Sequence, residues 1–188
     1  SFQLSMPKLY IANFLGVTAL GYFTPVNWVL LAFSLITSSL GSFLYPTISR
    51  KFAAGEQDLV WKTYLIYIVV FLVALPFAIV GYFVLPAVIK YILPDYIGII
   101  SSMQLVLISS VFDVFILIGS SWVALKDYKR MFFMASVMLL IRLLSLVWVY
   151  YQVDVTLLTI AKSMVFSSVF VSFFLFFIVV HQHIYKEK

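Results

Sequence analysis

The chain consists of long apolar runs separated by short stretches that hold most of its charged residues. No charged residue stands between Lys8 and Arg50 or between Lys62 and Lys90, and three further runs are nearly as free of charge. A helix needs about 20 mainly apolar residues to cross the hydrocarbon core of a bilayer. The pattern predicts a truncated helix over residues 1–15 and five full spans: residues 23–48, the run between Lys62 and Lys90, and residues 98–125, 130–151 and 155–180.

Glycine and proline residues modify this pattern. Two glycines and a proline between positions 16 and 25 interrupt the first long run, so we expect a short turn between the truncated helix and the first full span. Pro76 lies inside the next run and predicts a kink, because neighbouring helices can satisfy the carbonyl that a proline leaves unpaired. Pro86 and Pro94 bracket a short segment, residues 87–93, which we expect at the membrane interface.

Composition supports an all-α, polytopic transmembrane helical bundle. Of the 188 residues, 64% are hydrophobic and only 10% are charged, whereas a soluble domain carries roughly 25% charged residues. The apolar runs also lack the alternation of apolar and polar residues that a membrane β-barrel requires. Cysteine is absent, which excludes disulfides and cysteine-based metal sites.

The net charge of +5 indicates membrane topology rather than nucleic-acid binding, because the basic residues cluster between the apolar runs. Loops on the cytoplasmic side of a membrane protein carry an excess of lysine and arginine. Alternate sides here carry eight basic residues against one: Arg50, Lys51, Lys62, Lys126, Lys129, Arg130, Lys186 and Lys188 against Lys90. We therefore expect the 50–62 loop, the 126–130 loop and the C-terminus in the cytoplasm of a cell that holds this protein in its cytoplasmic membrane.

Three ionisable residues, Asp113, Arg142 and Lys162, fall inside predicted spans and are the candidate site residues. A charge at the centre of a membrane helix costs about 2.5–3.5 kcal/mol on insertion scales, so such residues usually face the bundle interior or a watery cavity. Two alternatives stay open: Asp113 and Arg142 could form a structural ion pair, and Lys162 could extend its amine to the outer interface. A cavity that held both cations would favour an anionic group such as a phosphate, which guanidinium forks bind well.

Other polar residues give weaker signals. Serine and threonine recur in the spans, often four residues apart as in Ser163 and Ser167 or Ser168 and Ser172, a spacing that favours close helix packing or hydroxyls along a sugar path. The pair His181 and His183 has no third ligand nearby, so no metal site is predicted. No Gly-rich phosphate loop, Walker motif or nucleophile elbow is present. We therefore predict no catalytic residue and no cofactor.

Several short motifs resemble the second half of polysaccharide flippases, which belong to the multidrug/oligosaccharidyl-lipid/polysaccharide exporter superfamily. The resemblance covers nearly the whole chain, and it rests on the order of its motifs more than on any one of them. The motifs are Met6-Pro7-Lys8-Leu9-Tyr10-Ile11, Phe14-Leu15-Gly16, Leu20-Gly21-Tyr22-Phe23, Tyr45-Pro46-Thr47-Ile48-Ser49-Arg50, Ala54-Gly55-Glu56, Leu93-Pro94-Asp95-Tyr96 and Leu125-Lys126-Asp127-Tyr128-Lys129.

The resemblance implies one six-helix lobe of a two-lobe transporter that works by alternating access. Residues 1–188 would form a single lobe that begins inside its first helix, with the N-terminal lobe of the same protein as its partner. The implied substrate is an anionic lipid-linked oligosaccharide, carried on polyprenyl pyrophosphate and flipped across the cytoplasmic membrane for surface polysaccharide assembly. Membrane lipid is the other expected partner, and nucleic acid is not expected.

Three other functions stay open from the sequence. An ion-coupled multidrug exporter lobe would need acidic cavity residues for cationic drugs, and only Asp113 is acidic within the spans. A membrane-embedded enzyme of lipid-linked sugar assembly would need a clustered acid, base or histidine site or a long catalytic loop, and the longest loops are about a dozen residues. A structural membrane subunit would need neither.

Overall fold

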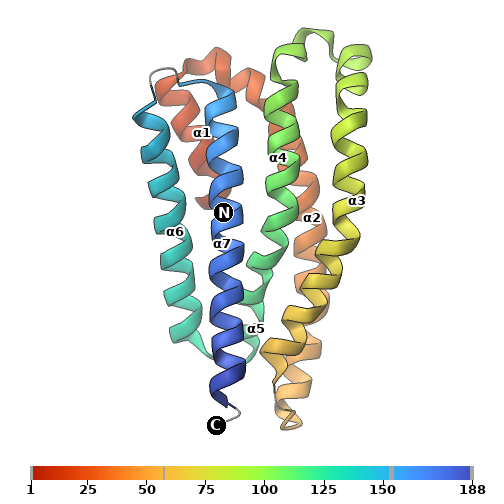
Figure 1. Ribbon diagram of the computed structural model, residues 1–188, viewed down its shortest axis with the longest axis vertical. Coiled ribbons are helices and arrows are strands. Elements are labelled where there is room, and N and C mark those ends of the chain that lie inside the picture. Colours follow the sequence, from red (N-terminus) through yellow and green to blue (C-terminus); the bar gives the residue numbers. More distant parts are fainter. Residues whose placement is uncertain (1, 57, 153–154, 187–188) are drawn as a thin grey trace.

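The computed structural model describes residues 2–56, 58–152 and 155–186, and these residues form an all-α bundle with no strand among them (Figure 1). The span over Pro94–Ala124 begins with one 3₁₀ turn, written here as η1, and is interrupted by a second, written η2. The elements are α1 (Phe2–Phe14), α2 (Gly16–Ala53), α3 (Leu59–Ile92), η1 (Pro94–Ile99), α4 (Ile100–Phe112), η2 (Asp113–Leu117), α5 (Ile118–Ala124), α6 (Tyr128–Tyr150) and α7 (Leu157–Lys186).

Five segments of the described chain are long and apolar enough to cross a membrane, as the sequence predicts. They are α2, α3, the composite segment Pro94–Ala124, α6 and the part of α7 from Leu157 to Ile184. They run alternately down and up the bundle, so the α2–α3 loop, the α5–α6 loop and the C-terminal end lie at the same end of the molecule (Figure 1). The basic loops of the sequence therefore share one end of the bundle. Asp154 and Lys188 lie outside the described residues.

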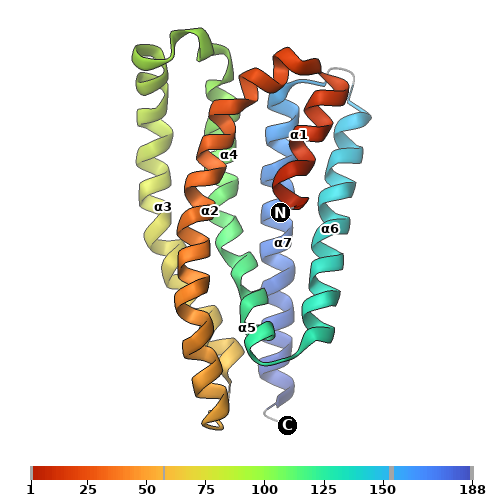
Figure 2. The same ribbon diagram turned by 180° about the vertical axis from the view of Figure 1, so that it is seen from behind.

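The first turn differs from the expectation. The break falls at Leu15 and Gly16, and Gly16 has a positive φ of 84° that glycine adopts without steric cost. The helix then continues through the region where a turn was expected, so the prediction that the first full span begins at residue 23 is wrong. The first residues of α2 instead run across the end of the bundle before the helix turns downward (Figure 2). Pro25 lies inside α2.

Residues 87–93 do not form a segment separate from the preceding span, and their expected position at the membrane interface stays a prediction. Pro86 lies inside α3, which continues to Ile92, and only Leu93 separates that helix from η1. Pro76 also lies in the interior of α3, and the helix changes direction between its lower and upper parts (Figure 1). This bend agrees with the kink predicted from the missing N–H of a proline.

The third span breaks where Asp113 interrupts its apolar run. The α-helix ends at Phe112, residues Asp113–Leu117 form a 3₁₀ turn, and α5 continues to Ala124. Side chains from other helices bond to carbonyls at this break: the Tyr67 hydroxyl donates to the Leu117 carbonyl at 3.1 Å, and the Ser172 hydroxyl donates to the Phe112 carbonyl at 3.1 Å. Irregular backbone at membrane depth is stable only where the protein itself supplies such partners.

The core lies around this broken span and α7, which packs against α4 and α6. Trp122, Tyr67 and Leu175 are fully buried in the lower part of the core, and Phe23, Val106 and Ile160 are buried in the upper part. Many large apolar side chains stay exposed on the outside, including Phe77, Phe83, Phe132 and Phe177. Apolar exposure on this scale is expected of a surface that faces lipid.

Gly81 of α3 allows the close approach of α4. A Cβ atom added there would lie 3.1 Å from Cδ2 of Leu107, which is tighter than an ordinary contact. We predict that Gly81→Leu lowers the free energy of unfolding by about 1–3 kcal/mol, because an overpacked contact forces neighbouring side chains and backbone to shift.

Thermal unfolding of the purified protein in detergent would measure the effect of Gly81→Leu. The matched control is Gly21→Leu, because a Cβ atom at Gly21 of α2 would meet nothing within 4 Å. Equal melting temperatures for the two variants would contradict the packing described for α3 and α4.

Candidate functional site

The candidate site is a charged cluster at the break in the third span. Asp113 is the first residue of η2, and its Oδ1 atom accepts two hydrogen bonds. The Arg142 guanidinium of α6 donates one at 3.1 Å, and the Ser168 hydroxyl of α7 donates the other at 2.8 Å. Three separate segments of the chain therefore meet at one carboxylate oxygen.

The local sequence explains why each side chain faces the cluster. In α6, Arg142 lies on the same stripe as the buried residues Met138 and Ser145, four residues before it and three after it. In α7, Ser168 lies on the buried stripe that also holds Val171 and Ser172. Helical periodicity therefore aims the polar side chains at the interior together with their apolar neighbours.

The serine hydroxyls connect the cluster to the broken backbone. The Ser172 hydroxyl lies 3.1 Å from the Phe112 carbonyl and 2.8 Å from the Ser168 carbonyl. The Ser145 hydroxyl donates to the Arg142 carbonyl at 2.8 Å. The i,i+4 pair of Ser168 and Ser172 thus allows helix packing and also bonds directly to the break.

The ion pair is only partly enclosed and leaves donors of the arginine unused. The side chains of Arg142 and Asp113 keep 17% and 27% of their exposure, and their contact joins one arginine nitrogen, Nη2, to one carboxylate oxygen, Oδ1. The Arg142 Nε atom is buried and has no hydrogen-bond partner among the described residues. The guanidinium therefore has capacity to bind a further anionic or polar group, in keeping with its five donors.

The pairing decides the electrostatics of the site. A single charge left in a membrane span costs several kcal/mol, whereas a hydrogen-bonded pair of opposite charges offsets much of that cost. Asp113 and Arg142 therefore form the structural ion pair that was one of the two possibilities open from the sequence.

Lys162 lies apart from this cluster. It is exposed on α7 and lines a groove between α6 and α7 together with Trp148, Phe166 and Phe170. The structure thus brings together two of the three candidate site residues, Asp113 and Arg142, and leaves the third on an outward-facing surface. Arg142 is not among the residues that line the groove of Lys162.

Sequence reasoning missed the role of Ser168. Its spacing from Ser172 indicated a packing stripe or a sugar path, and nothing in that spacing identified Asp113, 55 residues away, as its hydrogen-bond partner. A polar stripe on the buried face of a span is the only signal that could have found it, since buried hydroxyls need partners.

The C-terminal histidines, His181 and His183, lie near the end of the bundle that holds the basic loops, called here the basic end. The His183 ring stacks on the Trp61 ring with the centroids 4.8 Å apart and the planes nearly parallel. Among the described residues, no group of three or more His, Asp or Glu side chains is placed to hold a metal ion.

The basic end also carries an acidic residue that its neighbours hold in the charged form. The Glu56 carboxylate lies 2.7 Å from the Lys62 ammonium and 3.5 Å from that of Lys51. The hydrogen bond from Lys62 lowers the pKa of Glu56 below its usual value, and the charge of Lys51 adds to this shift. The loop between α2 and α3 is therefore crossed by ion pairs at its exposed tip.

Comparison of the chain with protein-family models, curated proteins and solved structures finds no match. The resemblance to polysaccharide flippases therefore stays a prediction from the motifs of the sequence. The fold and the cluster at Asp113 are the observations on which a function has to rest.

We predict that Arg142→Gln destabilises the protein by about 3–5 kcal/mol, because it leaves the Asp113 carboxylate buried without its counter-charge. The double variant Asp113→Asn with Arg142→Gln should recover most of the loss, since neither buried group is then charged and the amide at position 113 can still accept from Ser168. Thermal unfolding of purified variants in detergent would measure both effects.

The control for the ion pair is Lys90→Gln, an exposed lysine at the end of α3, which we expect to change stability by less than about 0.5 kcal/mol. If the loss of stability in the double variant equals the sum of the losses in Asp113→Asn and Arg142→Gln, the two charges do not interact and the description of the pair is wrong.

Proposed function

We propose that this chain is a lobe of a membrane transporter that helps to flip a polyprenyl-pyrophosphate-linked oligosaccharide across the cytoplasmic membrane by alternating access. The observation that carries the proposal is a spanning helix broken at Asp113, where the carboxylate is paired with Arg142 inside the bundle. Interrupted spans and buried charges are typical of transporters, whose binding sites lie near the bilayer midplane.

The broken helix supports the transport function physically. A 3₁₀ stretch within a helical span often marks a hinge, because its hydrogen bonds are poorer than those of an α-helix. Here the first residue of the 3₁₀ stretch is Asp113, whose carboxylate bonds to Arg142 of α6 and Ser168 of α7. A change in the partner of Asp113 would therefore act on three segments at once.

Arg142 is the residue that supports an anionic substrate. Its buried Nε atom has no partner in the described part of the chain, and its contact with Asp113 uses one nitrogen of the guanidinium. A phosphate group offers oxygens that a guanidinium binds through two parallel hydrogen bonds. We propose that Arg142 exchanges part of its contact with Asp113 for the pyrophosphate of the substrate during transport.

The other functions have less support. An exporter of cationic drugs would need a free carboxylate, and Asp113 already accepts from both Arg142 and Ser168. A membrane-embedded enzyme would need several reactive side chains in one pocket, and the described residues bring no such group to the cluster at Asp113. A purely structural subunit would need the pair for stability alone. An export assay on a folded variant that lacks the pair distinguishes this function from transport.

The paired variant Asp113→Asn with Arg142→Gln tests the transport role. We expect surface polysaccharide to fall by about tenfold or more even though this double variant folds, because the guanidinium that would hold the phosphate is missing. The measurement is surface polysaccharide in a bacterial strain whose export depends on this protein, normalised to the amount of protein in the membrane.

Lys90→Gln is the control for the export assay, because it removes an exposed charge distant from Arg142 along the chain. Wild-type export by the folded double variant would show that the pair is structural only, and the proposed role of Arg142 would then be abandoned.

The proposed orientation can be tested because the chain has no native cysteine. We expect a membrane-impermeant maleimide to label Asp95→Cys in intact cells, and to label Lys51→Cys and Lys129→Cys only after the membrane is permeabilised. The reason is that the excess of basic residues places the loops of Lys51 and Lys129 in the cytoplasm. Labelling of all three variants in intact cells, or the reverse pattern, would contradict the orientation.

A further inference from the structure

The surface between α6 and α7 carries a groove that the proposed transport function does not use. Its volume is about 550 Å³, and its walls are Ile141, Leu144, Ser145 and Trp148 from α6 and Lys162, Phe166 and Phe170 from α7. The two helices lie side by side in both views of the bundle (Figures 1 and 2). All but two of the lining side chains are apolar, and Lys162 is the one that carries a charge.

The depth of Lys162 follows from the start of α7. Thr156 and Thr159 fix that start reciprocally, because each hydroxyl accepts a hydrogen bond from the backbone N–H of the other residue at 3.2 and 2.8 Å. The span from Leu157 to Ile184 has 28 residues. At about 1.5 Å per residue it is about 12 Å longer than a hydrocarbon core of about 30 Å, which leaves about 6 Å outside at each end.

Lys162 follows Leu157 by five residues, so its Cα atom lies about 7.5 Å below the start of the helix. This position is close to the boundary of the hydrocarbon core, and the flexible lysine stem can carry the ammonium to the level of the lipid headgroups. Trp148, two residues before the end of α6, lies near the same boundary and is half exposed. Tryptophan is enriched at this level of a membrane.

The apolar part of the groove continues below the lysine. Phe166 and Phe170 follow Lys162 at intervals of four residues on the same face of α7, and both are more than half exposed. Leu144 lies opposite on α6 and is also exposed. In the described part of the chain no carboxylate lies within ion-pair distance of Lys162. A cation at headgroup level above an aromatic groove at acyl-chain level matches an amphiphile with an anionic head.

We propose that this groove binds an anionic phospholipid, with the headgroup phosphate on the Lys162 ammonium and one acyl chain against Leu144, Phe166 and Phe170. The site lies in the outward-facing groove between α6 and α7, and Asp113 and Arg142 do not line it. It therefore does not depend on the transport function. It assigns Lys162 to lipid binding instead of the substrate cavity.

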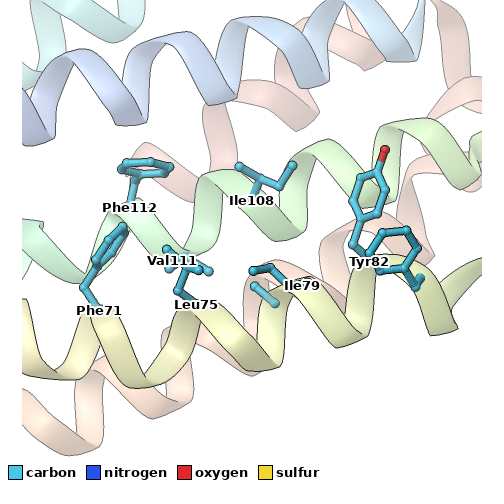
Figure 3. Close-up of a pocket in the computed structure, with 9 residues that line it drawn as sticks. Phe71, Leu75, Ile79, Tyr82, Ile108, Val111 and Phe112 are labelled. Carbon is cyan, nitrogen blue, oxygen red and sulfur yellow. The ribbon is translucent and has the colours of Figure 1, made fainter.

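A second apolar groove, between α3 and α4, carries no comparable site. Its volume is about 300 Å³, and its lining side chains converge from the two helices, with Phe71 and Leu75 among those from α3 and Ile108 and Phe112 among those from α4 (Figure 3). None of its lining residues is charged, so nothing in it would select one lipid headgroup over another. The cation at Lys162 makes the groove between α6 and α7 the more specific of the two.

The test is lipid binding to the purified full chain, measured by native mass spectrometry in detergent with added phosphatidylglycerol or phosphatidylcholine. We expect the wild type to bind phosphatidylglycerol about tenfold more tightly than phosphatidylcholine, because a charge-assisted contact to phosphate is stronger where the lipid has no cation of its own. Lys162→Gln should remove this preference, and Lys162→Arg should keep it.

Two control variants separate the headgroup contact from general effects. Lys90→Gln removes another exposed lysine from the same end of the bundle and should keep the preference for phosphatidylglycerol. Leu144→Trp should weaken the binding of both lipids by filling the groove, whereas Leu140→Trp, which changes an exposed residue one turn away that does not line the groove, should not.

Either of two results would overturn the proposal. One is equal binding of the two lipids to the wild type, and the other is an unchanged preference in Lys162→Gln. Thermal unfolding of Lys162→Gln without added lipid should match the wild type, since the residue is exposed, and this comparison excludes misfolding as the cause of lost binding. The assay involves no transport, so its outcome is independent of the export experiment.

Discussion

The structure depends on one constraint: polar groups that lie within hydrocarbon must find their partners inside the protein. Long helices meet it for most of the backbone, because each N–H bonds to a carbonyl four residues earlier. The constraint becomes severe at Asp113, where the helix is interrupted and a charge stands at the same place. The surrounding helices are arranged so that both needs are met together.

The bonds at the break come from side chains on three other helices. Tyr67 of α3 bonds to the carbonyl of Leu117, Ser172 of α7 to that of Phe112, and Arg142 of α6 to the carboxylate of Asp113. Each bond also fixes the rotation of its helix about the helix axis, because only one face of that helix carries the donor. The same hydrogen bonds therefore satisfy the polar groups at the break and determine how the helices are rotated in the bundle.

The two membrane-level cations have different surroundings for a related reason. Arg142 faces the interior, where a charge requires a counter-charge, and it pairs with Asp113. Lys162 faces outward near the start of α7, where its ammonium can reach the headgroup region and stay hydrated or meet a phosphate. The depth of a cation in the span and the face it occupies thus decide whether it becomes part of the core or part of the lipid-facing surface.

Much of the fold could be predicted from the sequence because its signals are local. The length of each apolar run determined the number of spans, and the clustered lysines and arginines determined which loops share an end. Asp113 was recognised as a charge inside the third span, but the break of the helix at that residue was not predicted. Gly21 and Pro86 were misinterpreted, because within a bundle a glycine or a proline can bend or continue a helix where an isolated peptide would break.

Only the tertiary structure decided that Asp113 pairs with Arg142, 29 residues away, that Ser168 completes the cluster, and that Lys162 points elsewhere. The reason is that these contacts depend on the relative rotation of separate helices, which packing in three dimensions determines and which no local pattern records.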